Sequence, residues 1–272
     1  GGGAGRNRMS SGAAGAARPM LSDILTDEIF VFLLIFTRFG TALMVMPALG
    51  EGLVPARVRL LLALFVAGVM VPVLGDRMPQ EAPASPFELL FLLLVEFLVG
   101  LMLGLSARLL VTAMDVAGML LSFQMSMSNA FAFNPAMATQ GSLVGSFLTV
   151  MAITLIFVTD LHHLFFAAVV ASYDMFPPGE MPVMGDAAQM IAHLVSHSFQ
   201  VGVQIAAPFL ILGLTFYAGL GLLARLMPQV QIFFIAMPMQ LLLGIVVLML
   251  ALSGMALFWL GEFEQALFYY MR

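Results

Sequence analysis

Residues 87–122 read FELLFLLLVEFLVGLMLGLSARLLVTAMDVAGMLLS, a long and strongly apolar run. As one helix this run would extend about 54 Å, whereas the hydrocarbon core of a bilayer is about 30 Å thick. Within the run, Gly100 and Gly104 lie one helical turn apart and predict close approach of a neighbouring helix. The run therefore predicts a membrane helix that bends strongly, folds back on itself or extends outside the bilayer.

Similar apolar segments make up most of the remaining chain, and polar or Gly/Pro-rich stretches separate them. They cover residues 29–50, 58–75, 142–171, 189–223 and 230–260. Prolines favour a kink or a break inside four of these segments: Pro47, Pro72, Pro208 and Pro238. Lipid requires backbone groups to be paired internally, and long alternating strand patterns are absent. The predicted fold class is an all-α, polytopic integral membrane protein of interrupted helices and helical hairpins, with about six hydrophobic segments.

The composition excludes several classes of protein. The chain is 62% hydrophobic and 9% charged, with a mean hydropathy of +1.06. Soluble domains are about 45–50% apolar and about 25% charged, so an ordinary soluble globule is excluded. A net charge of −5 gives no footprint for nucleic acid. The absence of cysteine excludes disulfides, thiolate metal sites and cysteine nucleophiles.

Residues 1–20 differ from the rest because they are rich in Gly, Ala and Ser and have no periodic apolar face. They predict a flexible tail, either native or added, and they lack the apolar centre of a signal peptide. Residues 21–272 are expected to form a single membrane domain. The arginines in short loops leave the membrane orientation open.

Five ionisable residues fall inside or beside apolar segments, where charge is costly and marks function or pairing. They are Arg38, Glu96, Arg108, Asp115 and Asp160. Arg108 and Asp115 are seven residues apart and share one helical face. The five residues predict a polar relay, an inward contact with a partner or, as the favoured interpretation, ion pairs within the protein.

The sequence offers no supported catalytic, cofactor or metal site. His193 and His197 lie four apart on one face, but no glutamate lies between them and no third ligand is evident. His162 and His163 follow Asp160, and neighbouring helical residues are expected to point in nearly opposite directions, which favours a polar cap. The residues match neither the aspartate pair of an intramembrane aspartyl protease nor the serine site of a rhomboid-type protease. We therefore expect that the protein is not an enzyme.

The segment 122–140, SFQMSMSNAFAFNPAMATQ, carries no charge and mixes polar residues with Met and Phe. Methionine adapts to varied shapes, and hydrophobic constrictions close pores by dewetting. Composition alone leaves two interpretations: an interfacial re-entrant loop or a deformable seal.

Three stretches resemble the FliR family of flagellar type III export-gate subunits. They are 47–50 (PALG) with 54–59 (VPARVR), then 123–125 (FQM) with 130–135 (AFAFNP), and finally 222–233 (LLARLMPQVQIF) followed by Pro238. The resemblance covers about residues 21–262 in the family's order, and the last stretch is the most specific. Asn134 and Gln231 depart from the residues common in the family. Injectisome homologues share the pattern, so virulence-type secretion is an alternative use.

The resemblance implies a subunit of a bacterial inner-membrane gate in the flagellar basal body. It implies a FliP-like part followed by a FliQ-like hairpin, assembly with FliP and FliQ into a channel, and contacts with FlhB, FlhA and membrane lipid. Unfolded flagellar subunits would pass through this channel. No nucleic acid, cofactor or metal is implied. A small-solute secondary transporter is a less favoured alternative, because no internal repeat or clustered binding residues are found.

The resemblance also implies roles for individual residues. A plug in the closed channel corresponds to Gln124, Met125, Phe131, Phe133 and Pro135. Structural or interface positions of the family motifs correspond to Arg38, Pro47, Pro55, Arg57, Arg59, Arg108, Asp115, Pro208, Arg225, Pro228, Gln229 and Pro238.

Overall fold

A computed structural model describes residues 21–50, 54–79, 82–83, 85–127, 142–180, 184–227 and 232–271. Every regular element in these ranges is helical, which confirms the predicted fold class. The α-helices are α1 (Leu21–Val45), α2 (Ala56–Leu74), α3 (Pro86–Gln124), α5 (Leu143–Val158), α6 (Leu161–Met175), α7 (Met184–Leu226) and α8 (Ile232–Phe268). Two short 3-10 helices are η1 (Gly75–Arg77) and η3 (Tyr269–Met271).

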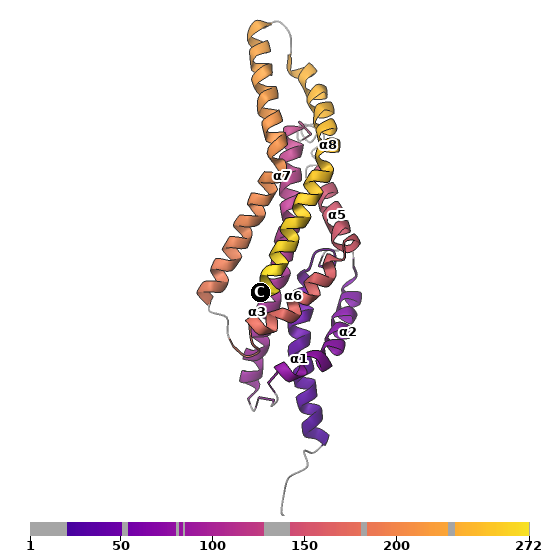
Figure 1. Cartoon of the computed structure of the whole chain (residues 1–272), viewed down its shortest axis with the longest axis vertical. Helices are drawn as coiled ribbons and strands as arrows, with labels where there is room; N and C mark the ends of the chain where they lie inside the picture. Colours follow the sequence, from indigo (N-terminus) through magenta and orange to yellow (C-terminus); the bar gives the residue numbers. More distant parts are fainter. Residues whose placement is uncertain are drawn as a thin grey trace, which may run out of the picture.

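Helix α3 forms the centre of an elongated molecule (Figure 1). It packs against α1, α5, α6, α7 and α8, so its neighbours come from both halves of the chain. Helices α7 and α8 form a hairpin that projects beyond the other described helices at the upper end of the view. The apolar run at the centre of the sequence is thus also the centre of the fold.

The run is a single continuous helix of 39 residues, so it does not fold back on itself. Its start follows from local sequence: Pro86 occupies the first turn, and the Ser85 hydroxyl accepts a hydrogen bond of 3.3 Å from the Phe87 N–H. Helices α7 and α8 are also long, with 43 and 37 residues. At 1.5 Å per residue each of these three exceeds about 50 Å, which is more than the hydrocarbon core requires.

A kink or a break was predicted at each of four prolines, and only Pro47 lies outside a helix. Pro47 lies in the turn that follows α1, whereas Pro72, Pro208 and Pro238 lie inside helices that continue past them. A proline inside a helix removes one backbone donor, and neighbouring groups in a packed membrane helix compensate for the loss. Helix α7 changes direction along its length without ending (Figure 1).

A sharp break occurs where the sequence predicted one apolar segment, residues 142–171. Helices α5 and α6 meet at an angle of 75°. Asp160 adopts the left-handed conformation between them, with φ of 59°. Aspartate is among the few non-glycine residues that enter this region readily. The single predicted segment is therefore two helices.

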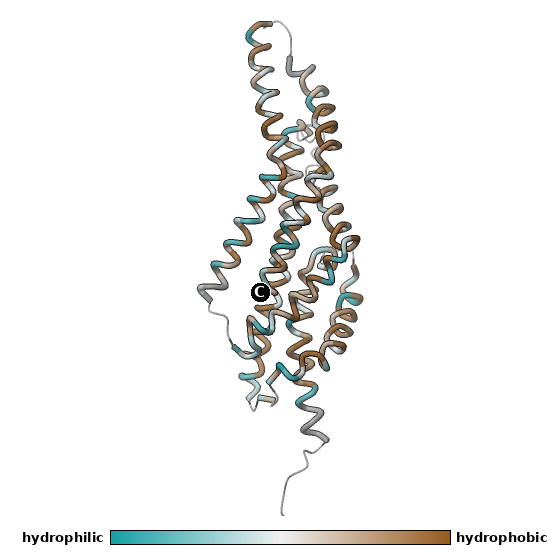
Figure 2. The backbone as a smooth tube through the Cα atoms, in the orientation of Figure 1, coloured by the Kyte–Doolittle hydropathy of each residue, from teal (hydrophilic) through white to brown (hydrophobic). Residues whose placement is uncertain are grey.

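Five of the described helices, α1, α2, α3, α7 and α8, are long and apolar enough to cross a membrane, and the bent α5–α6 pair is a sixth candidate. This number agrees with the predicted six segments. Within the most apolar stretch of α3, 44% of residues are buried, compared with 11% in α8. Figure 2 shows hydrophobic residues over much of α8 and in the upper part of α7. The hairpin therefore exposes an apolar surface that the other described helices do not cover.

Small residues allow α3 to approach its neighbours closely. A Cβ atom at Gly104 would lie 2.8 Å from Cβ of Val45 in α1, and one at Gly100 would meet the backbone carbonyl of Arg38. These contacts confirm the predicted packing role of the two glycines. The Trp259 indole N–H of α8 donates a hydrogen bond of 2.8 Å to the carbonyl of Leu110 in α3. Trp259 is completely buried.

Candidate functional site

The base of the uncharged segment lies at the end of α3. Helix α3 ends at Gln124, and the backbone N–H of Met125 donates to the carbonyl of Leu121 at 2.8 Å. Ser126 follows in the left-handed region, with φ of 57°. Of the five predicted plug residues, Gln124 and Met125 are placed here. Phe131, Phe133 and Pro135 lie outside the described residues.

Two serines join the ends of this segment. Ser142 precedes α5, and its hydroxyl oxygen lies 2.6 Å from that of Ser122 in α3. The Ser142 hydroxyl donates to the carbonyl of Gly118 at 3.1 Å and accepts from the N–H of Gly145 at 2.9 Å. Ser122 therefore donates to Ser142. The chain leaves α3 and re-enters α5 at one place in the molecule.

Gln240 of α8 connects this base to the α7–α8 hairpin. Its side-chain amide donates to the carbonyl of Gln124 and to the Tyr217 hydroxyl at 3.1 Å, and its oxygen accepts from the Ser126 hydroxyl at 2.7 Å. Gln240 is only 5% exposed. Sequence reasoning missed Gln240 and Tyr217. The available signal was an amide ten residues inside the apolar segment 230–260, because a buried amide requires partners.

Two glycines of the hairpin leave space for the side chains of the predicted plug residues Gln124 and Met125. A Cβ atom at Gly213 in α7 would collide with the side chain of Gln124. One at Gly244 in α8 would collide with Met125 and lie 3.1 Å from its methyl carbon. Met125 is buried, and the side-chain oxygen of Gln124 is also shielded from solvent. The hairpin therefore holds the start of the uncharged segment through close contact as well as through hydrogen bonds.

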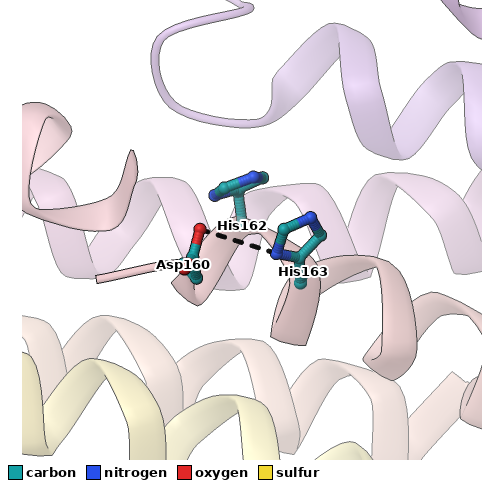
Figure 3. Close-up of side chains that lie close together, drawn as sticks. All are labelled: Asp160, His162 and His163. Carbon is teal, nitrogen blue, oxygen red and sulfur yellow. Dashed lines mark ion pairs between the residues drawn. The ribbon is translucent and has the colours of Figure 1, made fainter. Parts of the chain in front are cut away.

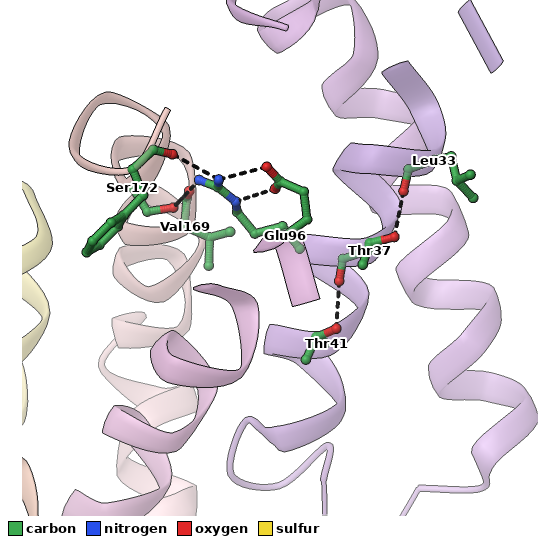
Figure 4. Close-up of polar contacts among 8 residues, drawn as sticks. Leu33, Thr37, Thr41, Glu96, Val169 and Ser172 are labelled. Carbon is green, nitrogen blue, oxygen red and sulfur yellow. Dashed lines mark hydrogen bonds and ion pairs between the residues drawn. The ribbon is translucent and has the colours of Figure 1, made fainter. Parts of the chain in front are cut away.

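A buried ion pair joins α1, α3 and α6. Arg38 donates to both carboxylate oxygens of Glu96, at 2.6 and 3.0 Å, and both side chains are completely buried. The guanidinium also donates to the Ser172 hydroxyl at 3.2 Å and to the carbonyl of Phe176 at 2.9 Å. Figure 4 shows Glu96 and Ser172 converging on this group. The Tyr173 ring lies under it, with 3.8 Å between the guanidinium carbon and the ring centroid.

This geometry confirms the favoured interpretation for Arg38 and Glu96, which is ion pairing within the protein. Arg108 is exposed and Asp115 is half-buried, and no ion pair joins them in the described part of the chain. Asp115 instead lies beside Gly145, where an added Cβ atom would come 2.5 Å from its carboxylate oxygen. The predicted charges therefore do not form one relay.

The remaining motif residues lie at helix ends and on exposed faces. Pro47 is buried in its turn, Pro55 precedes α2, and Arg59 donates to the carbonyl of Gly50 at 3.4 Å. The exposed members are Pro55, Arg57, Pro208, Arg225 and Pro238. Pro228 and Gln229 lie outside the described residues. These positions are dispersed over the molecule and do not form one site.

His197 has a partner that sequence reasoning did not find. Its Nε2 lies 3.2 Å from a carboxylate oxygen of Glu262 in α8. Both residues and His193 line a cavity of about 560 Å³ between α7 and α8. No group of three metal-ligating side chains includes the two α7 histidines within the described ranges. The His197–Glu262 contact therefore bridges two helices.

These features define a class of protein: a polytopic helical membrane protein with a long apolar hairpin and an uncharged segment anchored at both ends. Residues 29–266 match the sequence profile of the bacterial export proteins, family 1. Flagellar biosynthetic protein FliR of Caulobacter vibrioides is 38% identical over 240 residues, which cover 88% of this chain and 95% of that protein. FliR of Bacillus subtilis is 29% identical, covering 84% and 88%. Yop proteins translocation protein T of Yersinia pestis is 25% identical, covering 81% and 85%.

The chain belongs to the FliR family of bacterial export proteins. It is a membrane-embedded subunit of the flagellar type III export gate, and thus one component of a multi-subunit apparatus. Its role is structural and transport-related.

Proposed function

We propose that this chain assembles with FliP and FliQ in the bacterial inner membrane, and that together they form the channel that unfolded flagellar subunits cross. FlhB and FlhA are the further partners in this proposal. The observation that carries it is the uncovered apolar surface of the α7–α8 hairpin. Large side chains such as Leu214, Met249 and Leu250 are each at least 74% exposed. A single chain of this kind requires either lipid or protein to cover it.

The length of the hairpin indicates that protein, and not lipid alone, covers its exposed apolar surface. The apolar stretch of α7 has 39 residues and that of α8 has 36. Each extends more than about 50 Å, so an upright helix leaves roughly 20 Å outside a hydrocarbon core of about 30 Å. Apolar residues beyond the core need another apolar surface. Helical partner subunits supply it, and the small residues along α7 and α8 permit close packing.

Recovery of partners tests the assembly. The tagged chain is expressed with FliP and FliQ and purified in detergent, and a Leu250→Asn variant is compared with Phe87→Asn. Phe87 is 79% exposed at the start of α3, so it matches Leu250 in exposure but lies outside the hairpin. We expect wild type and Phe87→Asn to retain both partners and Leu250→Asn to retain at least tenfold less. A wild-type chain that purifies alone as a solute-binding monomer would contradict the proposed assembly.

We further propose that segment 122–140 is the plug of the closed channel. Its anchorage supports this role: Ser122 and Ser142 join its ends, and Gln240 ties its base to the hairpin. Its composition also suits the role, because uncharged Met and Phe side chains exclude ions and still adapt to a passing chain. Phe131, Phe133 and Pro135 belong to the proposed plug on the family resemblance.

Replacing Phe131 and Phe133 with Gly is expected to increase passive ion conductance through the assembled gate, because two large apolar groups leave the seal. The measurement is single-channel or vesicle conductance of the purified complex. Phe258→Gly on α8 is the control, since it removes an equally large side chain from outside the segment. Unchanged conductance in the double variant would show that neither phenylalanine contributes to the seal.

A further inference from the structure

Three potential metal ligands meet at the break between α5 and α6. Asp160, His162 and His163 each offer one ligand atom, and these atoms all lie within 4.8 Å of one another. Figure 3 shows the three side chains grouped at the start of α6. The ring centroids of the two histidines are 4.1 Å apart. The expectation that the two rings point in nearly opposite directions is therefore wrong.

Local geometry explains the convergence. Side chains in a helix lean toward its N-terminus, so both rings in the first turn of α6 lean toward Asp160. Asp160 occupies the N-cap position, but its carboxylate makes no capping hydrogen bond. One oxygen instead lies 3.7 Å from Nδ1 of His163. The expected polar cap is thus also absent at Asp160, and the carboxylate remains available as a ligand.

The environment of His162 points the same way. Its Nδ1 is shielded from solvent and has no hydrogen-bond partner among the described residues. Phe157 packs against the ring with 5.2 Å between centroids and holds it at the break. Asp160 and His163 are both more than 70% exposed, so their side chains are free to adjust. The His162 ring, which has an unpartnered nitrogen and is held by Phe157, lies beside two side chains that are free to adjust. A cation bound by all three residues would complete this arrangement.

The donor set indicates which cation. Two neutral imidazoles and one carboxylate are ligands typical of Zn²⁺, whereas Mg²⁺ and Ca²⁺ prefer oxygen alone. Zinc–nitrogen and zinc–oxygen bonds are about 2.0–2.2 Å, which places tetrahedral ligands about 3.3 Å apart. The 3.7 Å between Asp160 and His163 is close to this separation. The single carboxylate partly balances the cation's charge.

We propose that Asp160, His162 and His163 bind one divalent transition-metal ion, with Zn²⁺ preferred and water at the fourth position. The ion links the turn after α5 to the first turn of α6. It therefore stabilises the 75° break, which in these helices depends on one left-handed residue. This inference is independent of the proposed channel.

Metal titration of the purified full chain tests the site. The protein carries a tag without histidine, is treated with EDTA and is titrated with ZnCl₂ by calorimetry. CoCl₂ serves as a spectroscopic probe, because its visible absorption distinguishes coordination by imidazole and carboxylate from aqueous Co²⁺. The variants are Asp160→Asn, which keeps the shape and tolerates the left-handed conformation, His162→Ala and His163→Ala. The control is the double variant His193→Ala/His197→Ala.

We expect one Zn²⁺ per chain, at least tenfold weaker binding in each of the three site variants, and unchanged binding in the α7 control. The Trp259 fluorescence spectrum checks that each variant is folded. Absence of binding by wild type would overturn the proposal. Loss of binding only in the α7 control, or equal affinity of wild type and Asp160→Asn, would also overturn it.

Discussion

The Glu96→Gln variant is expected to be destabilised by about 3–5 kcal/mol, the usual cost of leaving one member of a buried ion pair without its partner. Arg38 keeps its contacts with Ser172 and Phe176 but loses both charge-assisted bonds to the carboxylate. The measurement is thermal or denaturant unfolding of the purified protein in detergent, followed by Trp259 fluorescence. Trp259 is the single tryptophan and is completely buried, so it reports on packing between α3 and α8.

A double variant separates the lost charge balance from lost packing. Arg38→Met/Glu96→Leu removes both charges and keeps much of the apolar volume, so it is expected to be more stable than Glu96→Gln alone. Such replacements of buried pairs are often nearly neutral. A single variant as stable as wild type would show that Glu96 does not balance the charge of Arg38. A double variant less stable than the single one would show the same.

The Gly118→Ala variant is expected to lower stability by about 1–3 kcal/mol, because its new methyl group has no space. A Cβ atom at Gly118 collides with the backbone of Gly145 in α5 and lies 2.8 Å from the carbonyl carbon of Val144. Helices α3 and α5 must separate to accept it, which also weakens the Ser122–Ser142 hydrogen bond. Thermal unfolding gives the stability, and conductance of the assembled gate gives the effect on the proposed plug.

Gly68→Ala in α2 is the matched control. A Cβ atom at Gly68 meets nothing within 4 Å. Alanine has the higher helix propensity by about 0.8–1.0 kcal/mol, so this variant is expected to be neutral or slightly more stable. The same Gly→Ala substitution is therefore expected to lower the stability at Gly118 and to leave it unchanged or raise it slightly at Gly68. Equal behaviour of the two variants would contradict the close α3–α5 contact.

Hydropathy predicted much of the fold because long apolar runs leave few alternatives to membrane helices. It located all six segments and the uncharged stretch after α3. It did not predict the break at Asp160, because apolar residues continue on both sides and one left-handed residue makes the turn. At Pro72, Pro208 and Pro238 it predicted a kink or a break, and the helices continue past all three prolines. Periodicity reports how apolar residues are distributed along the chain, and it does not report the backbone conformation of one individual residue.

The candidate site was less predictable because its contacts join residues far apart in sequence. Arg38 and Glu96 are separated by 58 positions, and Gln124 and Gln240 by 116. Arg38, Glu96 and Gln240 were visible as polar groups in apolar segments, and Gln124 as part of the uncharged segment, but the sequence did not show which groups meet. The glycines at positions 213 and 244 give even less signal, because glycine is frequent in membrane helices.

The hydrogen bond between Ser122 and Ser142 has a consequence for the thermodynamics of opening. Bringing the ends of a loop together costs entropy that depends mainly on the number of residues enclosed. Here the serines bring those ends together through helix contacts that lie outside the loop itself. As long as this junction persists, the closure entropy is the same for every position of the enclosed residues, so in the proposed plug it cancels between the shut and the open state of the proposed channel. The balance between the two then depends on the contacts that the loop gains and loses, so point substitutions are expected to shift it more directly than changes in loop length.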